Sequence, residues 1–107
     1  MSKIAYEEYL IEINVNHHQI NLVRIGRHYL EKHASYMNDE LILELVYSLH
    51  DQSFEMDSTT RGIEYFVADV EQGAPPKIYR LVFLIEGEQL EILGIVNAYR
   101  RKNRRKK

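Results

Sequence analysis

Two histidines stand in the segment GRHYLEKH, residues 26–33. Histidine suits acid–base catalysis because its side chain changes charge near neutral pH. On an α-helix, His28 and His33 would project about 140° apart around the axis, so one helix would offer only one of them to a small site. Zinc pairs on helices stand four residues apart, and this pair stands five apart, so we expect no metal there. His28 is then either a catalytic group or a partly exposed helix-start residue.

Arg80 lies in IYRLVFLIEG, residues 78–87, the most apolar segment of the chain. Alternation along a strand puts Arg80 in an otherwise apolar row of side chains. Burying an unpaired charge is costly, so Arg80 must either reach a cleft or form an ion pair. Glu64 and Glu91 are the candidate partners for that ion pair.

The last eight residues, RRKNRRKK at 100–107, contain seven of the fourteen basic residues and no acidic residue. The preceding 99 residues contain seven basic and sixteen acidic residues, a formal charge of −9. A basic tail on an acidic body suits a polyanion or an acidic partner. The alternative is a solvated chain end without a target.

Size and composition indicate one domain over residues 1–99, followed by the basic tail at 100–107. The chain has no cysteine, which excludes disulfides and thiolate metal sites. We see no signal-peptide pattern and no apolar run of about 20 residues, so we expect a cytoplasmic protein that makes no membrane contact. P-loop, Rossmann, GxSxG and HExxH patterns are missing, and we expect no cofactor.

Local patterns predict the elements that would position these residues. Alternating apolar and polar residues predict a β-hairpin over 8–25, with NHHQ as its connection. A short helix is predicted over 27–36. Asn38 is the expected N-cap of a second, amphipathic helix over 39–50.

Strands are predicted over 63–70, 78–87 and 88–99, with a short edge strand at 53–57 before the turn DSTTRG. The predicted fold class is therefore α+β: an N-terminal β-hairpin, two helices, then a three- to four-stranded antiparallel sheet with the helices packed on one face.

The order of these segments resembles a known group. The segments GRHYLEKH, NDELILELVYSLHDQSF, IEYFVADV and YRLVFLIEGEQLEILGIVNAYRR are similar in order to the compact ribonuclease-toxin fold of barnase, EndoU, the colicin RNases and RelE. The likeness spans about residues 26–101 and is nearest to the small phage- and plasmid-borne BrnT-type proteins. The hairpin at 8–25 departs from that pattern and suggests docking.

The resemblance implies an RNA-binding protein that could cleave RNA without metal, through attack of the 2′-hydroxyl on the neighbouring phosphate. The residues it implies for catalysis are His28, Arg61, Arg80 and Tyr99. For RNA binding, the resemblance and the basic tail together suggest Tyr65, Asn97, Arg100, Arg101, Lys102, Arg104 and Arg105.

Two alternatives remain from sequence. The first is a non-enzymatic module of the same fold, a phage or mobile-element accessory protein that binds or regulates an antitoxin or another protein partner. The hairpin and the acidic body favour it. The second, DNA binding through the tail, is weaker because no helix has a basic recognition face.

Overall fold

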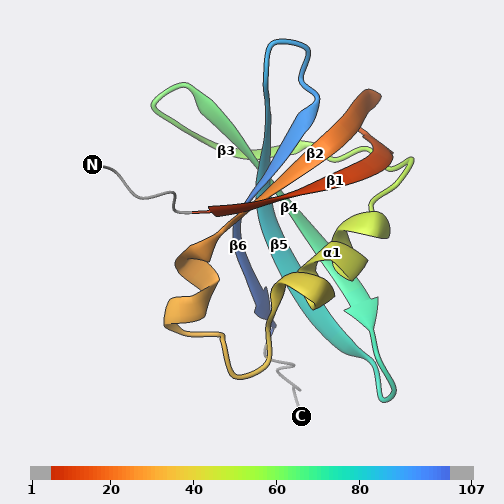
Figure 1. Ribbon diagram of the computed structural model, residues 1–107, viewed down its shortest axis with the longest axis vertical. Coiled ribbons are helices and arrows are strands. Elements are labelled where there is room, and N and C mark those ends of the chain that lie inside the picture. Colours follow the sequence, from red (N-terminus) through yellow and green to blue (C-terminus); the bar gives the residue numbers. More distant parts are fainter. Residues whose placement is uncertain (1–5, 102–107) are drawn as a thin grey trace.

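The computed structural model describes residues 6–101 of the chain. Six strands and two helical segments follow one another: β1 Tyr6–Val15, β2 His18–Gly26, the 3₁₀-helix η1 Arg27–Glu31, the α-helix α1 Asp39–Tyr47, β3 Met56–Thr60, β4 Ile63–Gln72, β5 Lys77–Glu86 and β6 Ile92–Arg100. All six strands form one curved sheet in the order β1-β2-β6-β5-β4-β3 (Figure 1).

The N-terminal hairpin is confirmed. Its two-residue turn, Asn16 and His17, has positive φ at both positions, 55° and 67°. Tight hairpins need that backbone geometry, and asparagine adopts it more readily than most residues. The turn residues Arg61 and Gly62 join β3 to β4 in the same way, with φ of 53° and 80°.

Two structural features place β6 in the middle of the sheet. It pairs antiparallel with β5 and parallel with β2. A parallel neighbour requires a long crossover connection, which here contains η1, α1, β3, β4 and β5. The sheet is therefore mixed, because the N-terminal hairpin adds to the strands that end the chain.

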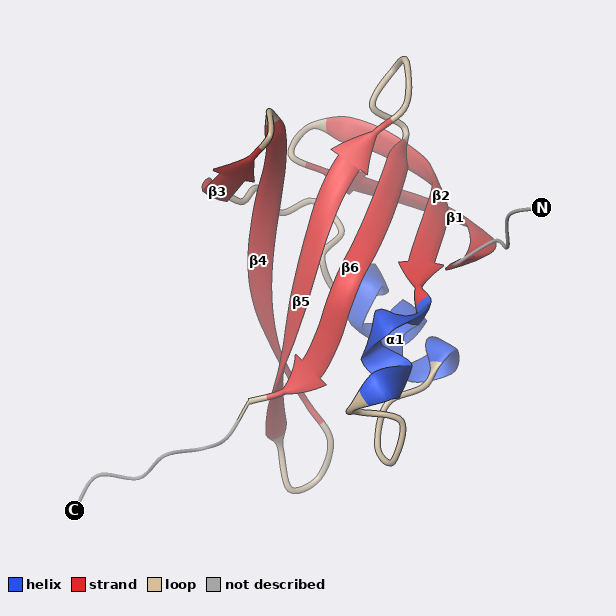
Figure 2. Ribbon diagram, turned by 90° about the vertical axis from the view of Figure 1, so that its left-hand side faces the viewer, coloured by secondary structure: helices blue, strands red, loops and turns tan. Residues whose placement is uncertain are grey.

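The core lies between the sheet and α1. Asn38 caps α1, as predicted, by accepting a hydrogen bond from the Leu41 backbone N–H at 2.7 Å. Apolar side chains of α1 and the residues after it join strand residues in one buried cluster, among them Ile42, Leu45, Leu81 and Phe83. Figure 2 shows the helical segments together on one side of the sheet.

The predicted α+β fold class is wrong in its helices and its sheet. Strands make up 56% and helical segments 15% of the structure, so the protein is mainly β. Residues 27–36 form only the short η1, because this stretch lacks a continuous apolar face. Tyr29 is buried, whereas Leu30 is 41% exposed. The sheet has six strands in mixed orientation, not three or four antiparallel ones.

Two strand boundaries also differ from the prediction. The edge strand β3 occupies Met56–Thr60, so it starts later than the predicted strand at 53–57 and extends into the predicted turn DSTTRG. β6 begins at Ile92, and a loop precedes it. Within residues 6–101, no helix has the length and apolar character needed to cross a membrane.

The end of β2 positions η1. The β2–β6 pairing stops at Ile25 and Ile95, while β6 continues to Arg100. The edge of β6 beyond Ile95 therefore lacks a neighbouring strand on that side. The segment that begins with η1 lies beside this edge instead, which places it at the same end of the molecule as the last residues of β6 (Figure 1).

Candidate functional site

A hollow of about 390 Å³ lies between the η1 segment and the end of β6. It is lined by His28, Lys32, His33, Asn97 and Tyr99. Three of these five are residues that the sequence analysis singled out: His28, Asn97 and Tyr99. All five carry polar groups that can donate hydrogen bonds, and the hollow opens to solvent.

Both histidines line this hollow. The prediction that only one of them could do so assumed that both stand on one α-helix. η1 ends at Glu31, and the backbone of Lys32 departs from helical dihedrals with φ −131°. His33 therefore lies beyond the helical turn, and the 140° separation of an α-helix does not apply. His33 is also held by its backbone N–H, which donates to the Tyr29 carbonyl at 2.8 Å.

The ring of His33 is fixed by two tyrosines. It stacks on Tyr99 with ring centroids 5.5 Å apart and planes inclined by 25°. Its Nδ1 lies 2.7 Å from the Tyr36 hydroxyl, which accepts a hydrogen bond from the Arg100 backbone N–H at 3.3 Å. Tyr36 can therefore donate its proton to Nδ1 of a neutral His33, which then carries its own proton on Nε2, and it can accept from Nδ1–H when the ring is an imidazolium.

His28 has the opposite arrangement. Its Nδ1 lies 3.5 Å from a carboxylate oxygen of Glu31, and its side chain is 61% exposed. A carboxylate beside Nδ1 favours the proton on that nitrogen. The Nε2 atom of a neutral His28 then presents a lone pair. The hollow thus combines one imidazole that can present a lone pair with one that can present an N–H group.

Arg80 does not line the hollow. Its guanidinium donates two hydrogen bonds to Asp69, at 2.8 and 3.0 Å, and Arg101 donates a third at 2.9 Å. The predicted ion-pair partners Glu64 and Glu91 are therefore wrong. Hydrogen bonding to Asp69 raises the pKa of Arg80, and the same bonds hold the pKa of Asp69 below its usual value. Arg80 pairs across the sheet with Tyr99, so it lies beside the hollow.

Arg61 and Tyr65 lie away from the hollow. Arg61 occupies the β3–β4 turn, eight residues before Asp69, which corresponds to about 26 Å along a strand. Tyr65 lies four residues before Asp69 on β4, or about 13 Å. Neither residue shares a site with His28.

The first two residues of the predicted tail belong to the folded body. Arg100 ends β6 and places its guanidinium 4.4 Å from the centre of the Tyr36 ring. The Arg101 backbone N–H donates to the Ile78 carbonyl at 2.7 Å. The remaining predicted RNA-binding residues, Lys102, Arg104 and Arg105, lie outside the described residues.

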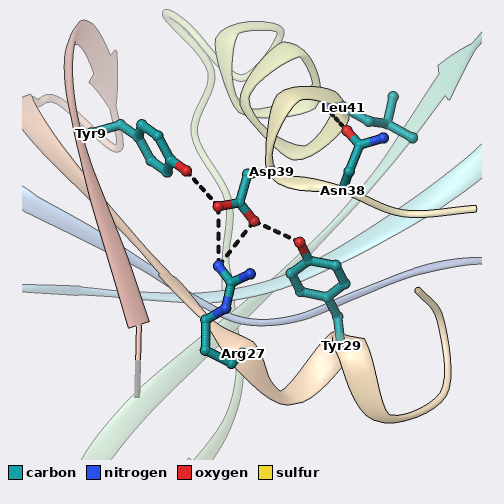
Figure 3. A network of polar contacts seen from close by, with 6 residues as sticks. All are labelled: Tyr9, Arg27, Tyr29, Asn38, Asp39 and Leu41. Carbon is teal, nitrogen blue, oxygen red and sulfur yellow. Dashed lines mark hydrogen bonds and ion pairs between the residues drawn. The ribbon is translucent and has the colours of Figure 1, made fainter. Parts of the chain in front are cut away.

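A second polar cluster surrounds Asp39 (Figure 3). The hydroxyls of Tyr9 and Tyr29 each donate to one carboxylate oxygen at 2.5 Å, and Arg27 donates to both oxygens at 3.1 and 3.0 Å. Because these residues come from β1, η1 and the first turn of α1, the cluster ties three elements together. It lines no hollow described above, and its groups satisfy one another.

The pKa values of this cluster reflect its hydrogen bonds. The bond to Asp39 raises the pKa of Tyr9 to about 12, while burial followed by the bond to Asp39 raises the pKa of Tyr29 to about 12. Burial alone would raise the pKa of Asp39. The hydrogen bonds from Tyr29, Tyr9 and Arg27 outweigh that effect and hold this pKa below its usual value.

Sequence reasoning missed Lys32 and rejected His33 as a partner of His28. The signal that could have placed His33 outside a helix is Asn38, a good N-cap five residues later, because the first helical segment must end before a new helix starts there. Nothing in the local sequence indicates that Tyr9 and Tyr29 meet Asp39, because Tyr9 is 30 residues away from it in the chain.

Among residues 6–101, no three histidine or carboxylate side chains come together as a metal-binding group. Comparison with known proteins gives no relative: no protein-family model, no curated protein and no solved structure matches the chain.

Proposed function

We propose that the hollow between η1 and β6 binds RNA and cleaves its backbone without a metal ion. The observation that carries the proposal is the pair of imidazoles, His28 and His33, in one hollow with opposite hydrogen-bonding environments. Lys32 adds an ammonium group to the same hollow. Transesterification of RNA needs a base, an acid and a cation, and these three side chains supply them.

The reaction assigns one step to each group. The Nε2 lone pair of His28 takes the proton of the ribose 2′-hydroxyl, and the 2′-oxygen forms a bond to the neighbouring phosphorus. The bond from phosphorus to the 5′-oxygen breaks, and the His33 imidazolium gives its Nε2 proton to that oxygen. The products are a 2′,3′-cyclic phosphate and a 5′-hydroxyl. Lys32 stabilises the charge on the phosphorane oxygens.

The charge distribution near the hollow supports binding of a polyanion. Lys32 lines the hollow, and Arg100 contacts Tyr36, which is hydrogen-bonded to His33. Arg80 and Arg101 both donate to Asp69, so Arg101 lies close to Arg80. The acidic body had argued against RNA, but these cations gather at one end of it. Tyr99 offers an aromatic side chain on which a base can stack.

The proposal does not depend on the two-helix layout, which the structure lacks. The likeness to RelE- and BrnT-type toxins remains a prediction, and the hollow supports an RNA-cleaving activity on chemical grounds alone. Arg61 has no part in the proposal because it lies far from the hollow. Arg80 acts as a positioning residue through its place beside Tyr99 and Asp69.

The test is cleavage of a fluorescent single-stranded RNA by the full chain in excess chelator, between pH 5 and 8, the range over which imidazole side chains commonly change charge. We expect His28→Ala and His33→Ala each to slow cleavage by roughly 100-fold or more, the usual effect of losing a general acid or base. His18→Ala is the matched control, since His18 begins β2 at the other end of the sheet.

Three results would overturn this proposal. One is RNA left intact by a folded wild-type protein across that pH range. A second is cleavage that stops in chelator, and a third is equal activity in wild type, His28→Ala and His33→Ala, which indicates a contaminating nuclease. The first of these results would favour the non-enzymatic alternative, in which the chain binds a protein partner and does no chemistry.

A further inference from the structure

We propose that a second cavity, enclosed by three hairpin connections, binds a small organic cation: an amine with an apolar body. This hairpin cavity has a volume of about 380 Å³. The connections β1–β2, β3–β4 and β5–β6 all contribute to its lining, and Figure 1 shows them at the end of the sheet opposite to η1. The hairpin cavity is separate from the hollow and has no part in the proposed RNA cleavage.

Apolar side chains form most of the hairpin cavity: Ile63, Phe66, Leu84, Ile85 and Leu90. Ile63 and Leu90 belong to different connections and remain 45% and 38% exposed. A ligand with an apolar body would remove this surface from water, which is favourable. A concave site of a few hundred Å³ with a mainly apolar lining is typical of sites for small molecules.

The backbone at Leu90 also favours a ligand. Its φ of 56° lies in the left-handed region, which leucine rarely adopts. Residues held in such conformations are common at ligand clamps. Glycine or asparagine would fit this backbone more easily, yet the chain places a large apolar side chain here, at the wall of the hairpin cavity.

The charges at the hairpin cavity select a cation. Glu64 and Glu86 line it, and no lysine or arginine of residues 6–101 does so. Glu64 forms no ion pair within residues 6–101. Arg24 donates to Glu86 at 3.3 Å but also to Glu8 at 2.7 Å, so these three side chains have a net charge of −1. With Glu64 the local charge is −2, which attracts a cation and repels an anion.

Two further ionisable residues lie near these carboxylates. His18 lines the hairpin cavity from β2, and Arg61 precedes Gly62 in the β3–β4 turn but does not line the cavity. Imidazole side chains are mostly neutral at pH 8, whereas a primary ammonium such as that of lysine stays protonated there. Binding measured at pH 8 therefore reports the attraction between the ammonium and the carboxylates.

The experiment compares the 2-phenylethylammonium ion with 2-phenylethanol, its neutral isostere. Each is titrated into the full chain at pH 8, and the methyl signals of leucine and isoleucine are followed by NMR. We expect saturable shifts at Ile63, Leu84 and Leu90, and none at Leu10 and Leu30, which are exposed leucines elsewhere on the molecule.

The ammonium ion should bind at least about threefold more tightly than the alcohol at low salt, the usual scale for contacts between exposed charges. Salt at about 0.5 M should remove most of that difference, because it screens exposed charges.

Three variants assign the two parts of the ligand. Glu64→Gln should lower the affinity for the ammonium ion and leave that for the alcohol unchanged, so their ratio falls toward one. Glu71→Gln is the matched control: it makes the same change at an exposed position of β4, seven residues or about 23 Å further along the strand. Ile63→Ala should weaken both ligands by a similar factor, because they share the apolar ring.

Several outcomes would overturn this inference. Equal affinities for the two ligands at low salt would show that the carboxylates select nothing. A ratio that survives in Glu64→Gln would have the same meaning. Shifts at Leu10 and Leu30 as large as those at Ile63 and Leu90 would show unspecific apolar binding and no site. None of these results bears on RNA cleavage, since the hairpin cavity and the hollow share no lining residue within residues 6–101.

Discussion

Neighbouring residues of one 3₁₀ turn contribute to two polar clusters that differ in hydrogen bonding. Arg27 and Tyr29 belong to the Asp39 cluster, in which two tyrosine hydroxyls and one guanidinium nitrogen donate to a single carboxylate. His28 belongs to the hollow. There, Nε2 of both histidines and the ammonium of Lys32 have no hydrogen-bond partner among residues 6–101.

The two clusters therefore have different roles: the Asp39 cluster stabilises the fold, and the hollow can bind a ligand. A carboxylate that accepts bonds from two hydroxyls and a guanidinium contributes to folding, because those groups would be costly to leave unpaired in the folded state. Free donors at an open hollow are hydrated, so they contribute little to folding and remain available to a ligand. The same short segment therefore stabilises the protein at one cluster and can bind at the other.

The largest expected effect is on the Asp39 cluster. Asp39→Ala should lower the free energy of unfolding by about 3 kcal/mol, because it removes the acceptor of three donors, two of them tyrosine hydroxyls. His28→Ala should change it by no more than about 0.5 kcal/mol, as is usual for exposed side chains. Urea unfolding followed by circular dichroism measures both values.

Glu40→Ala is the matched control for this comparison. Glu40 is the neighbouring acidic residue in the first turn of α1 and is exposed. Its removal should cost only the interaction with the helix dipole, about 0.3–1 kcal/mol. Equal losses from Asp39→Ala and Glu40→Ala would mean that the hydrogen bonds from Tyr9, Arg27 and Tyr29 add nothing.

A smaller effect is expected from acid. Hydrogen bonds hold the pKa of Asp39 below its usual value of 3.8. A carboxyl group whose pKa is lower in the folded state stabilises the protein above the unfolded pKa, and that contribution is lost as pH falls through the folded pKa. The stability difference between wild type and Asp39→Asn should therefore shrink as pH falls from 7 to 3. A difference that stays constant would contradict this role of the carboxylate charge.

Local patterns predicted the parts of the fold that local forces determine. The hairpin turn at Asn16 and the N-cap at Asn38 depend on residues only a few positions apart, and both are present. The alternation in 78–87 also placed Arg80 on the opposite face from Leu81 and Phe83, which are buried.

The errors came from contacts between distant segments. The parallel pairing of β2 with β6 joins residues about 70 positions apart, and no local pattern in either strand indicates it. This pairing makes the sheet six-stranded. The segment after β2 then covers the free edge of β6 as a single 3₁₀ turn, although residues 27–36 contain residues that are common in helices.

The sequence indicated some residues of the candidate site, but it did not indicate how they are arranged in space. The structure brings His28, Asn97 and Tyr99 to one hollow, whereas Arg61 lies in the β3–β4 turn, away from them. The place of His33 depends on the backbone at Lys32, where the chain leaves η1. A sequence pattern interpreted as an α-helix therefore predicts the wrong direction for the side chains that follow Lys32.

The smallest expected effect concerns Arg80, the residue that the sequence made most conspicuous. Arg80 and Asp69 are each about one-third exposed, at 32% and 34%, so solvent screens their ion pair. Arg80→Met should therefore cost less than about 1 kcal/mol of unfolding free energy. Because Arg80 lies beside Tyr99 but outside the hollow, the variant should also slow RNA cleavage far less than His33→Ala does. A loss of cleavage as large as that of His33→Ala, in a protein of unchanged stability, would show instead that the guanidinium leaves Asp69 and acts on the phosphate, as the sequence had suggested.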